Sequence, residues 1–471
     1  MECKIFFGDV EVGKTKYQNI INPYNQEVVS TYPLCDESDA KEALDIAKKA
    51  FYKNKDIPLS QRVEWLEDVI EKLEERKEEF AKIITDEIGK PIKFSLVEVQ
   101  RCIETFKLSI SAALEFGGET FNSDAMPSGR KVESYYKREP IGVAVLITPF
   151  NFPLNLIAHK LAPALLMGNS VVLKPTPEAP RVAYELVKLF VSSQKRSPNA
   201  LSLVYGDAEV GNALVTSEIP SAISFTGSVP VGKIILKNAG IKKVSLELGG
   251  NAGTYIDESA NLEEASKKCA VGAFVNSGQV CISLQRIYVH KSVSEEFSSL
   301  LAKETNSLIV GNPYDKNTFM GPLINEDAVS RAKSWIESAK EEGAKVICGG
   351  KSEGRVFYPT VLTDVTDDMN IVCEEVFAPI VSIVEVEDFD EALKKINNSP
   401  YGLQYSIFTN SLQNTKRAIN EFECGGVVIN DIPTLRFDIQ PYGGVKLSGI
   451  GREGPKFAME EFTQIKSVVI C

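Results

Sequence analysis

Long apolar runs are missing from the chain. No apolar stretch approaches the roughly 18 residues that a transmembrane helix needs, so no membrane partner is expected. The N-terminal residues MECKIFFGDVEVGK lack the basic start and the apolar run of roughly 7–15 residues that mark a secretory signal. These absences favour a cytoplasmic protein.

Paired cysteines and histidine clusters are missing as well. The nine cysteines are odd in number, are scattered and form no CxxC pair, which argues against a disulfide framework and against a zinc site. Only two histidines are present, His159 and His290. We therefore expect no metal, and most of the thiols are predicted to be small buried side chains in a reducing compartment.

Excess positive charge is also absent. The net charge is −12 and the isoelectric point is about 5.1. A basic field is needed to bind phosphate backbones, so a nucleic-acid partner is disfavoured. With 471 residues, 44% of them hydrophobic and 25% charged, the chain has the composition of a globular protein, and its length predicts several domains.

What the chain does contain is a regular alternation of apolar strands and helices. Helical spacing covers residues 36–89, with Gly89 as the expected C-cap. From residue 140, short apolar strands alternate with helices, which predicts an open parallel α/β sheet, and a second α/β unit begins after residue 250. Ligands bind at the carboxyl ends of such strands, so loops 148–153, 174–178 and 226–233 should surround one crevice.

The segment FTGSVPVGKI, residues 225–234, has the glycine spacing of a phosphate-binding P-loop in Gly227 and Gly232, followed by Lys233. Ile234 stands where a P-loop requires Ser or Thr for magnesium, so a P-loop kinase is disfavoured. Two interpretations remain. The start of the helix can hold a pyrophosphate through backbone N–H groups, or it is a plain strand–turn–helix junction.

Two further segments have an ordinary and a catalytic interpretation. ITPFNFP, residues 147–153, places Asn151 in a proline-stiffened loop, either as a structural residue or as a donor to a developing oxyanion. SLELGGN, residues 245–251, places Glu247 between leucines, either facing solvent on a strand or buried with the raised pKa of a general base.

One cysteine has a distinctive setting. Cys281 lies in NSGQVCIS, residues 276–283, in a turn-like segment after an apolar helical run, and neither histidine is near it in the sequence. Taken alone it is as ordinary as the other eight cysteines. The segments become informative only as an ordered set.

That set resembles a known family. TPFNFP, VVLKP, FTGS, LELGG, GQVC, EEVFAP and PYGGVKLSG follow the order and spacing of the NAD(P)-dependent aldehyde dehydrogenase superfamily, from about residue 22 to the C-terminus. Within it the chain is most similar to archaeal-type lactaldehyde dehydrogenases. The resemblance implies two α/β domains, one of them Rossmann-like, and a β oligomerisation arm.

The resemblance also implies residue roles. Cys281 matches the nucleophile that forms a thiohemiacetal and then a thioester, Glu247 the general base, and Asn151 an oxyanion donor. Glu453 matches a position sometimes assigned to proton relay, and the substrate side is assigned to Arg101 and Arg436. The cofactor, NAD or NADP, is assigned to Thr148, Pro149, Phe150, Lys174, Pro177, Gly227, Ser228, Glu375 and Phe377.

Two departures from the family pattern bear on specificity. Many members have Arg before the cysteine, where this chain has Val280, which makes phosphate recognition doubtful. Many NAD-preferring members have Glu where this chain has Pro177. The absence of that carboxylate removes a barrier to the 2′-phosphate of NADP and weakly favours NADP as the cofactor. The adjacent Glu178 could partly substitute for the missing carboxylate.

The remaining expectations concern domains and substrate. Residues 1–117 and 138–247 are assigned to the dinucleotide-binding domain, 248–445 to the catalytic domain, and 118–137 with 446–471 to the arm and C-terminal tail of a homodimer or homotetramer. The expected substrate is a small hydroxyaldehyde such as lactaldehyde. Alternatives are succinate semialdehyde, sulfolactaldehyde or non-phosphorylating glyceraldehyde-3-phosphate oxidation, and a CoA-acylating enzyme is less favoured.

Overall fold

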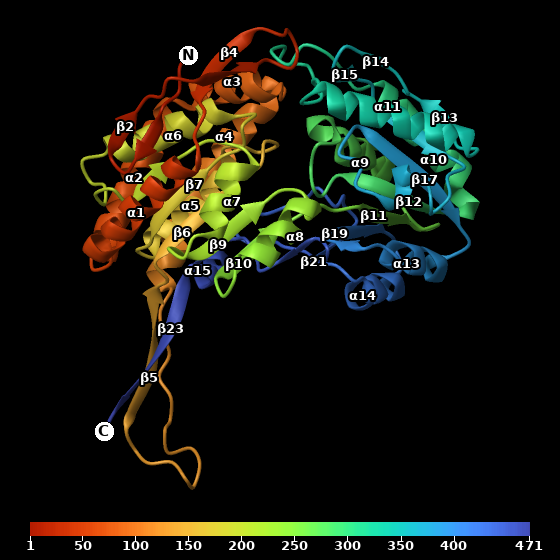
Figure 1. Cartoon of the computed structure of the whole chain (residues 1–471). Coiled ribbons are helices and arrows are strands. Elements are labelled where there is room, and N and C mark those ends of the chain that lie inside the picture. The colour runs from red at the N-terminus through yellow and green to blue at the C-terminus, as the bar shows by residue number, and fades with distance from the viewer.

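The computed structural model describes residues 1–471 and has two lobes, from one of which a long two-stranded ribbon projects (Figure 1). The first lobe opens with four short strands and four helices. They are β1 (Ile5–Phe7), β2 (Val10–Val12), β3 (Tyr17–Ile21), β4 (Val28–Pro33), α1 (Glu37–Asn54), α2 (Leu59–Glu75), α3 (Lys77–Ile88) and α4 (Ile92–Glu115). The helices predicted over residues 36–89 are confirmed. Asp36 forms a capping box at α1, and Gly89 ends α3 in the left-handed conformation at φ 70°.

The core of the first lobe is an eight-stranded sheet in the order β2-β1-β8-β7-β6-β9-β10-β22. Its five central strands are parallel, namely β6 (Val143–Ile147), β7 (Ser170–Lys174), β8 (Leu201–Leu203), β9 (Pro220–Thr226) and β10 (Lys243–Glu247). Their order reverses between β6 and β9. Such a switch point opens a crevice at the carboxyl ends of the two strands, which is where an open α/β sheet binds its ligand.

Helices cover both faces of this sheet. They are α5 (Asn155–Leu166), α6 (Pro180–Ser192), α7 (Ala208–Thr216) and α8 (Val229–Asn238). Every residue of β6, β7 and α5 is buried, as expected of a central parallel strand and the helix packed on it. This lobe holds the largest hydrophobic core of the molecule.

The second lobe is built on a seven-stranded sheet in the order β13-β16-β17-β12-β11-β19-β20, which is parallel except at β13. Its strands are β11 (Ala252–Ile256), β12 (Leu284–His290), β13 (Lys345–Cys348), β16 (Thr360–Thr363), β17 (Ile380–Val386), β19 (Gln404–Phe408) and β20 (Gly426–Ile429). Its main helices are α9 (Leu262–Phe274), α10 (Ser294–Asn306), α11 (Glu326–Glu341), α13 (Phe389–Asn397) and α14 (Leu412–Glu421). The α/β fold class is therefore confirmed in both lobes.

Strand β17 is shorter than the sequence predicts. The apolar pattern indicates a strand over 376–386, whereas β17 begins at Ile380. The preceding residues form an irregular segment in which Phe377 has a left-handed φ of 49°, which is incompatible with a strand. Short elements complete this part of the chain, namely α12 (Asn370–Cys373), β14 (Ser352–Glu353), β15 (Val356–Phe357), β18 (Tyr401–Gly402) and β21 (Val445–Lys446).

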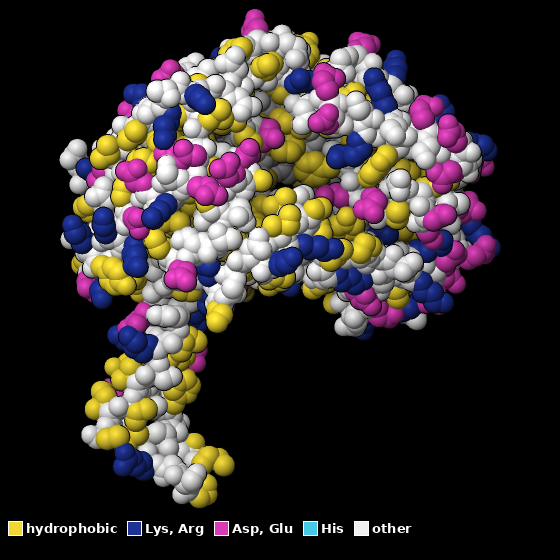
Figure 2. All heavy atoms as spheres, in the orientation of Figure 1, with side chains coloured by type: hydrophobic (Ala, Val, Ile, Leu, Met, Phe, Trp, Pro, Cys, Tyr) yellow, Lys and Arg dark blue, Asp and Glu magenta, His cyan; other side chains and the backbone are white.

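The ribbon consists of β5 (Glu133–Pro140) and β23 (Thr463–Ile470), paired antiparallel along their whole length. The alternating pattern of residues 464–470 would suit strand pairing across a subunit boundary, and within the chain one edge of this segment pairs with β5. Of residues 446–471, only β23 enters the ribbon, since β22 (Gly449–Ile450) joins the first sheet and α15 (Pro455–Glu461) packs on α4 and α5. Figure 2 shows apolar side chains along the ribbon. Ile465 and Val469 of β23 are exposed.

None of the helices combines the length and the apolar character that crossing a membrane would require.

Candidate active site

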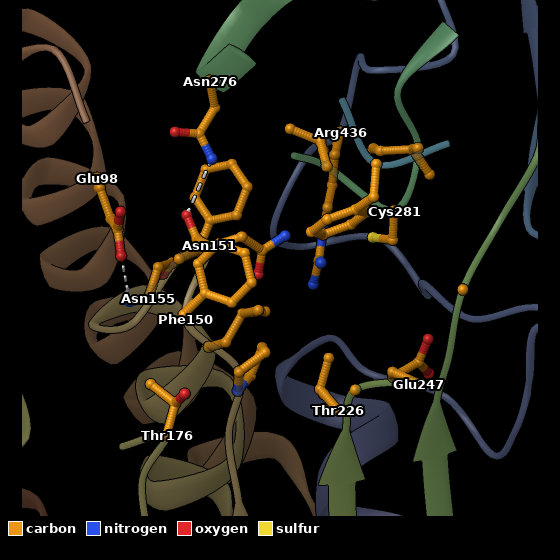
Figure 3. Close-up of a pocket in the computed structure, with 18 of the residues that line it drawn as sticks. Glu98, Phe150, Asn151, Asn155, Thr176, Thr226, Glu247, Asn276, Cys281 and Arg436 are labelled. Carbon is orange, nitrogen blue, oxygen red and sulfur yellow. Dashed lines mark hydrogen bonds between the residues drawn. The ribbon is translucent and has the colours of Figure 1, made fainter. Parts of the chain in front are cut away.

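A cavity of about 670 Å³ is lined by residues of both lobes, a size typical of ligand pockets. Figure 2 shows a recess between the two lobes, and Figure 3 shows side chains converging on the cavity. The first lobe contributes residues that follow its parallel strands, from the segments 149–152, 176–178 and 226–228. The three loops predicted from the sequence to share one crevice do share it.

Individual residues of these loops differ in their access to the cavity. Pro149 and Phe150 follow β6, and Gly227 and Ser228 follow β9; all four line it. The side chain of Ser228 makes no cap hydrogen bond to α8, so the first N–H groups of that helix are not capped by it. Three residues assigned to the cofactor, Thr148, Lys174 and Pro177, are not among the lining residues, whereas Thr176 and Glu178 are.

The turn that carries Cys281 has a strained backbone. Asn276, Ser277 and Gly278 are consecutive left-handed residues, with φ of 52°, 57° and 70°. Non-glycine residues rarely adopt this conformation, and Asn tolerates it best. Gly278 is required for a second reason, because a Cβ there would lie 2.2 Å from the Ala378 carbonyl oxygen.

Hydrogen bonds fix this turn to its surroundings. Ser277 Oγ donates to the Gly321 carbonyl at 2.9 Å, and the Gln279 side-chain oxygen accepts from the Ile324 N–H at 3.0 Å. Strained backbone persists only where the surrounding structure holds it. The apolar helical run seen in the sequence therefore ends in a rigid turn that presents Cys281 to the cavity.

The Cys281 thiol is partly exposed to the cavity and lies 3.0 Å from the hydroxyl of Tyr442. Burial raises the pKa of the thiol to about 12, while the contact with Tyr442 acts in the opposite direction. All nine cysteines are free thiols. A base or a donor is therefore needed before the sulfur can act as a thiolate.

Asn151 is held beside this turn. Its Nδ2 donates to the Gln279 carbonyl at 3.0 Å, and its own carbonyl accepts from Lys90 Nζ at 2.7 Å. Lys90 forms a buried ion pair with Glu98, whose other oxygen accepts from the Leu154 N–H at 2.9 Å, next to the start of α5. Figure 3 shows Asn151 between Glu98 and Cys281. The amide is both a structural link and a side chain on the cavity wall.

Glu247 ends β10 and is buried, with 3% of its surface exposed, so it does not face solvent from the strand. Neither carboxyl oxygen has a hydrogen-bond partner. Burial, aided by the negative charge of Glu453, raises the pKa of Glu247 well above its ordinary value. Figure 3 shows Glu247 and Thr226 at the ends of neighbouring strands on the cavity floor. An unpaired buried carboxyl on a cavity wall is poised to accept a proton.

Behind this floor lies an ion network. Lys160 Nζ donates to Glu453 at 2.8 Å, and Arg436 pairs with the other oxygen of Glu453 at 3.2 Å. Burial alone would raise the pKa of Glu453, but these two cations lower it to about 2. Glu453 is therefore held as an anion, whereas the pKa of Glu247 is shifted in the opposite direction.

The network continues to Arg101. Asp438 accepts two hydrogen bonds from the Arg101 guanidinium, at 2.6 and 2.9 Å, and lies 3.0 Å from His159 Nε2. Arg436 Nη2 lies 3.2 Å from the same imidazole nitrogen. Burial lowers the pKa of His159, so the ring is neutral. Arg101 and Arg436 both line the cavity, and the side chain of Arg436 is only 10% exposed, so its salt bridges are buried and do not lie on the surface.

Glu375 and Phe377 also line the cavity, from the segment before β17. Glu375 accepts from the Gly250 N–H at 3.1 Å, and burial raises the pKa of its carboxyl to about 7. Gly249 is needed here because a Cβ would lie 2.3 Å from this carboxylate. Phe377 packs edge-on against Phe150 of the first lobe at 5.9 Å.

Several residues of the site were not predicted from the sequence. Tyr442, Asp438 and His159 contact Cys281, Arg101 or Arg436, yet each looks ordinary in its segment. Tyr442 and Asp438 lie close to Arg436 in the sequence, and His159 directly precedes Lys160 in α5. Only the fold brings these positions together. No group of three or more His, Cys, Asp or Glu side chains is arranged to hold a metal ion.

A protein family and several characterised proteins match nearly the whole chain. A model described as the aldehyde dehydrogenase family matches residues 10–468. A lactaldehyde dehydrogenase of Methanococcus aeolicus is 41% identical over 95% of this chain and 96% of that protein. A 3-sulfolactaldehyde dehydrogenase of Priestia megaterium is 41% identical over 96% of this chain and 94% of that protein.

Solved structures agree with these relatives. Aldehyde dehydrogenase 21 of Physcomitrella patens, in complex with its reaction product succinate, has a TM-score of 0.96 and 36% identity, covering 100% of this chain and 98% of that chain. The glyceraldehyde-3-phosphate dehydrogenase GapN of Methanocaldococcus jannaschii, complexed with NADP, has a TM-score of 0.92 and 39% identity, covering 97% of this chain and 100% of that chain.

Proposed function

The chain is an NAD(P)-dependent enzyme of the aldehyde dehydrogenase family, and on that premise we propose that it oxidises a small hydroxyaldehyde such as lactaldehyde to the carboxylic acid. One observation carries the proposal. A single cavity brings together a cysteine on a rigid turn, an amide beside that turn and an unpaired buried carboxyl, in Cys281, Asn151 and Glu247. These are the groups that covalent aldehyde oxidation needs.

The residues on the first lobe's cavity wall fit a dinucleotide. Gly227 and Ser228 precede α8, whose free N–H groups suit a pyrophosphate. Glu375 and Phe377 lie on the opposite wall and would hold the nicotinamide end. When bound, the cofactor accepts the hydride that leaves the substrate carbon. Lys174, Thr148 and Pro177 would act from just behind the cavity wall.

The chain's own residues then carry out the remaining steps. The Cys281 thiolate attacks the aldehyde carbon, and the new oxyanion is stabilised by the Asn151 amide and the Cys281 N–H. Loss of hydride from the thiohemiacetal leaves a thioester on Cys281. Glu247 takes a proton from water, the resulting hydroxide attacks the thioester carbon, and the acid leaves as the sulfur regains its negative charge.

A second substrate class is favoured by the ion network. Arg101 and Arg436 both line the cavity, where they pair with Asp438 and Glu453. A substrate with a single anionic group would find guanidinium donors there. Succinate semialdehyde or sulfolactaldehyde fits this charge. Val280 beside Cys281 leaves glyceraldehyde 3-phosphate less favoured, and the presence of Glu247 does the same for CoA-acylating chemistry.

The test is an absorbance assay at 340 nm with a panel of aldehydes and both cofactors. Lactaldehyde, succinate semialdehyde, sulfolactaldehyde, glyceraldehyde 3-phosphate and propanal separate hydroxyl, carboxylate, sulfonate, phosphate and apolar recognition. The proposal expects the highest kcat/KM with a hydroxyaldehyde, and the second candidate expects it with a monoanionic semialdehyde. No reduction of either cofactor with any aldehyde would overturn both.

The assembly and the location are proposals too. The exposed apolar side chains of the ribbon support a homodimer or homotetramer, because unpaired strand edges with apolar side chains favour association. The two sheets and the ribbon support the proposed division into a dinucleotide-binding domain, a catalytic domain and an arm, although β22 and α15 of the C-terminal segment pack on the first lobe. A cytoplasmic site of action is also proposed, and the nine free thiols support it, since reduced cysteines are typical of a reducing compartment. Size-exclusion chromatography with light scattering would measure the assembly.

A further inference from the structure

The hydroxyl of Tyr442 contacts the sulfur of Cys281, and the mechanism above assigns it no part. The two atoms are 3.0 Å apart, and while the thiol is protonated either one can donate the hydrogen bond. We propose that Tyr442 is a catalytic residue whose phenolic O–H stabilises the Cys281 thiolate. The inference rests on the proposed role of Cys281 as nucleophile.

Three features hold the phenol in place. The backbone of Tyr442 forms a reciprocal pair with that of Glu453, with N–H to carbonyl distances of 3.0 and 2.7 Å. The Arg436 guanidinium lies 3.8 Å above the centre of the ring, in a cation–π contact. The ring is buried and belongs to a small apolar cluster with Val280, Ile282 and Leu403. The hydroxyl therefore has a fixed direction, toward the sulfur.

The chemistry of the thiolate sets the direction of the hydrogen bond. A thiolate has no hydrogen, so once the thiol ionises only the phenol can donate. Burial raises the pKa of Tyr442 well above its ordinary value, so the phenol keeps its own proton. The proton lost by the thiol passes to solvent in the cavity, to which Cys281 is partly exposed, and the phenolic O–H bond stays intact throughout.

The site provides few other groups that could stabilise the Cys281 thiolate. Neither a histidine nor a lysine hydrogen-bonds to Cys281, and the nearby cation Arg436 stacks on the Tyr442 ring. Hydrogen bonds to charged groups are stronger than those between neutral groups, and are worth most where water is excluded. The phenol therefore acts where a histidine would act in many cysteine enzymes.

The test is the alkylation of Cys281 by iodoacetamide between pH 6 and 10, without cofactor, followed by peptide mass spectrometry so that the other eight thiols do not interfere. Tyr442→Phe keeps the ring and removes only the hydroxyl. Below the thiol pKa the rate follows the thiolate population. We expect a rate about tenfold lower at every such pH, equivalent to a thiol pKa about one unit higher. An equal or a faster rate would overturn the proposal.

A matched control is Tyr405→Phe, which removes a buried hydroxyl that bonds the Tyr401 carbonyl at 2.7 Å, away from the cavity. Its alkylation rate should equal that of the unmodified protein. Should Tyr442→Phe fail to fold, site-specific 3-fluorotyrosine at position 442 decides the question. Its hydroxyl is a stronger donor, so alkylation should become faster, and an unchanged or slower rate would count against Tyr442.

The same samples separate this inference from the proposed function. If protein fully alkylated at Cys281 still oxidises aldehydes at the normal rate, Cys281 is not the nucleophile and both ideas fail. If alkylation abolishes activity while Tyr442→Phe leaves the rate of Cys281 alkylation unchanged, only the proposed role of Tyr442 is wrong.

Discussion

The two lobes contribute to the cavity from opposite ends of their strands. In the first lobe the site residues follow the strands, as Asn151 follows β6, Gly227 follows β9 and Glu247 ends β10. In the second lobe they precede the strands, since Cys281 lies before β12 and Glu375 before β17. The carboxyl ends of one parallel sheet thus face the amino ends of the other.

This difference separates two kinds of construction. The first lobe places its groups at a topological switch point, where any open α/β sheet has room for a ligand. The second lobe places its groups at the amino ends of its strands, where no such general rule applies. It positions them with strained turns that contain the left-handed residues Asn276, Ser277 and Phe377. We therefore expect the first lobe to supply binding and proton transfer, and the second to supply the covalent step.

The largest effect should come from the second lobe. Cys281→Ala removes the atom to which the substrate would be attached, so no thiohemiacetal and no hydride donor can form. We expect kcat to fall by roughly 10⁴-fold or more, with no burst of reduced cofactor on rapid mixing. Binding of NADP, measured by tryptophan fluorescence, should survive. Residual turnover close to normal would mean that the covalent step lies elsewhere.

Changing the first lobe should give a different kinetic picture. Glu247→Gln keeps the volume but cannot take a proton, so the thioester should form and its hydrolysis should slow. We expect a burst near one equivalent of reduced cofactor per active subunit, then turnover slowed by roughly 10²–10⁴-fold. Loss of the burst would show that Glu247 is needed earlier, to deprotonate Cys281. Normal turnover would place the base at another residue.

A substitution at Arg436 tests how the cavity recognises the substrate. Arg436→Ala should raise KM for hydroxy or acidic aldehydes by roughly tenfold, since a charge-assisted hydrogen bond is lost, and should change KM for propanal much less. Arg436→Lys is the matched control, because it keeps the charge and loses the planar fork. Equal changes for all aldehydes would indicate a purely structural role, through Glu453 and Tyr442.

A smaller difference is expected in the cofactor. Pro177 in place of a carboxylate predicts that NADP is used with a kcat/KM within about a hundredfold, ~2.7 kcal/mol, of that for NAD. Glu178 lines the cavity one position further on and accepts a hydrogen bond from Thr176. A stronger preference for NAD would show that Glu178 repels the 2′-phosphate, and Glu178→Gln should then reduce that preference.

The smallest effects concern the backbone of the two lobes. Gly278→Ala introduces a Cβ at φ 70° and against the Ala378 carbonyl, so it should destabilise the protein by about 1–3 kcal/mol. Gly211→Ala, in the middle of α7, adds a Cβ that meets only the Lys174 side chain, in ordinary van der Waals contact at 3.7 Å, and should instead stabilise the protein by about 0.5–1 kcal/mol. Thermal unfolding measures both. If both substitutions shift the melting temperature in the same direction, the proposed difference in backbone strain between the two lobes is wrong.

The same contrast explains how far the sequence could be interpreted. The strands and helices of the first lobe were predictable because buried parallel strands read as continuous apolar runs, and the shared crevice followed from their carboxyl ends. The family resemblance pointed to Cys281 and Glu247, and both line the cavity. The left-handed turn at Asn276 and the contact between Tyr442 and Cys281 were not predictable, because they depend on positions more than 150 residues apart or on backbone angles that no local pattern encodes.

The pairing of β10 with β22 also has a consequence for the order of events during synthesis. Glu247 lies opposite Gly449, so the edge that positions the proposed base is completed only after about 200 further residues have left the ribosome. At roughly 5–20 residues per second this takes about 10–40 s. β5 waits still longer, for β23. A nascent chain can thus form the central strands of its first sheet early, while the edges of β10 and β5 stay exposed. The position of the proposed base is completed only near the end of synthesis.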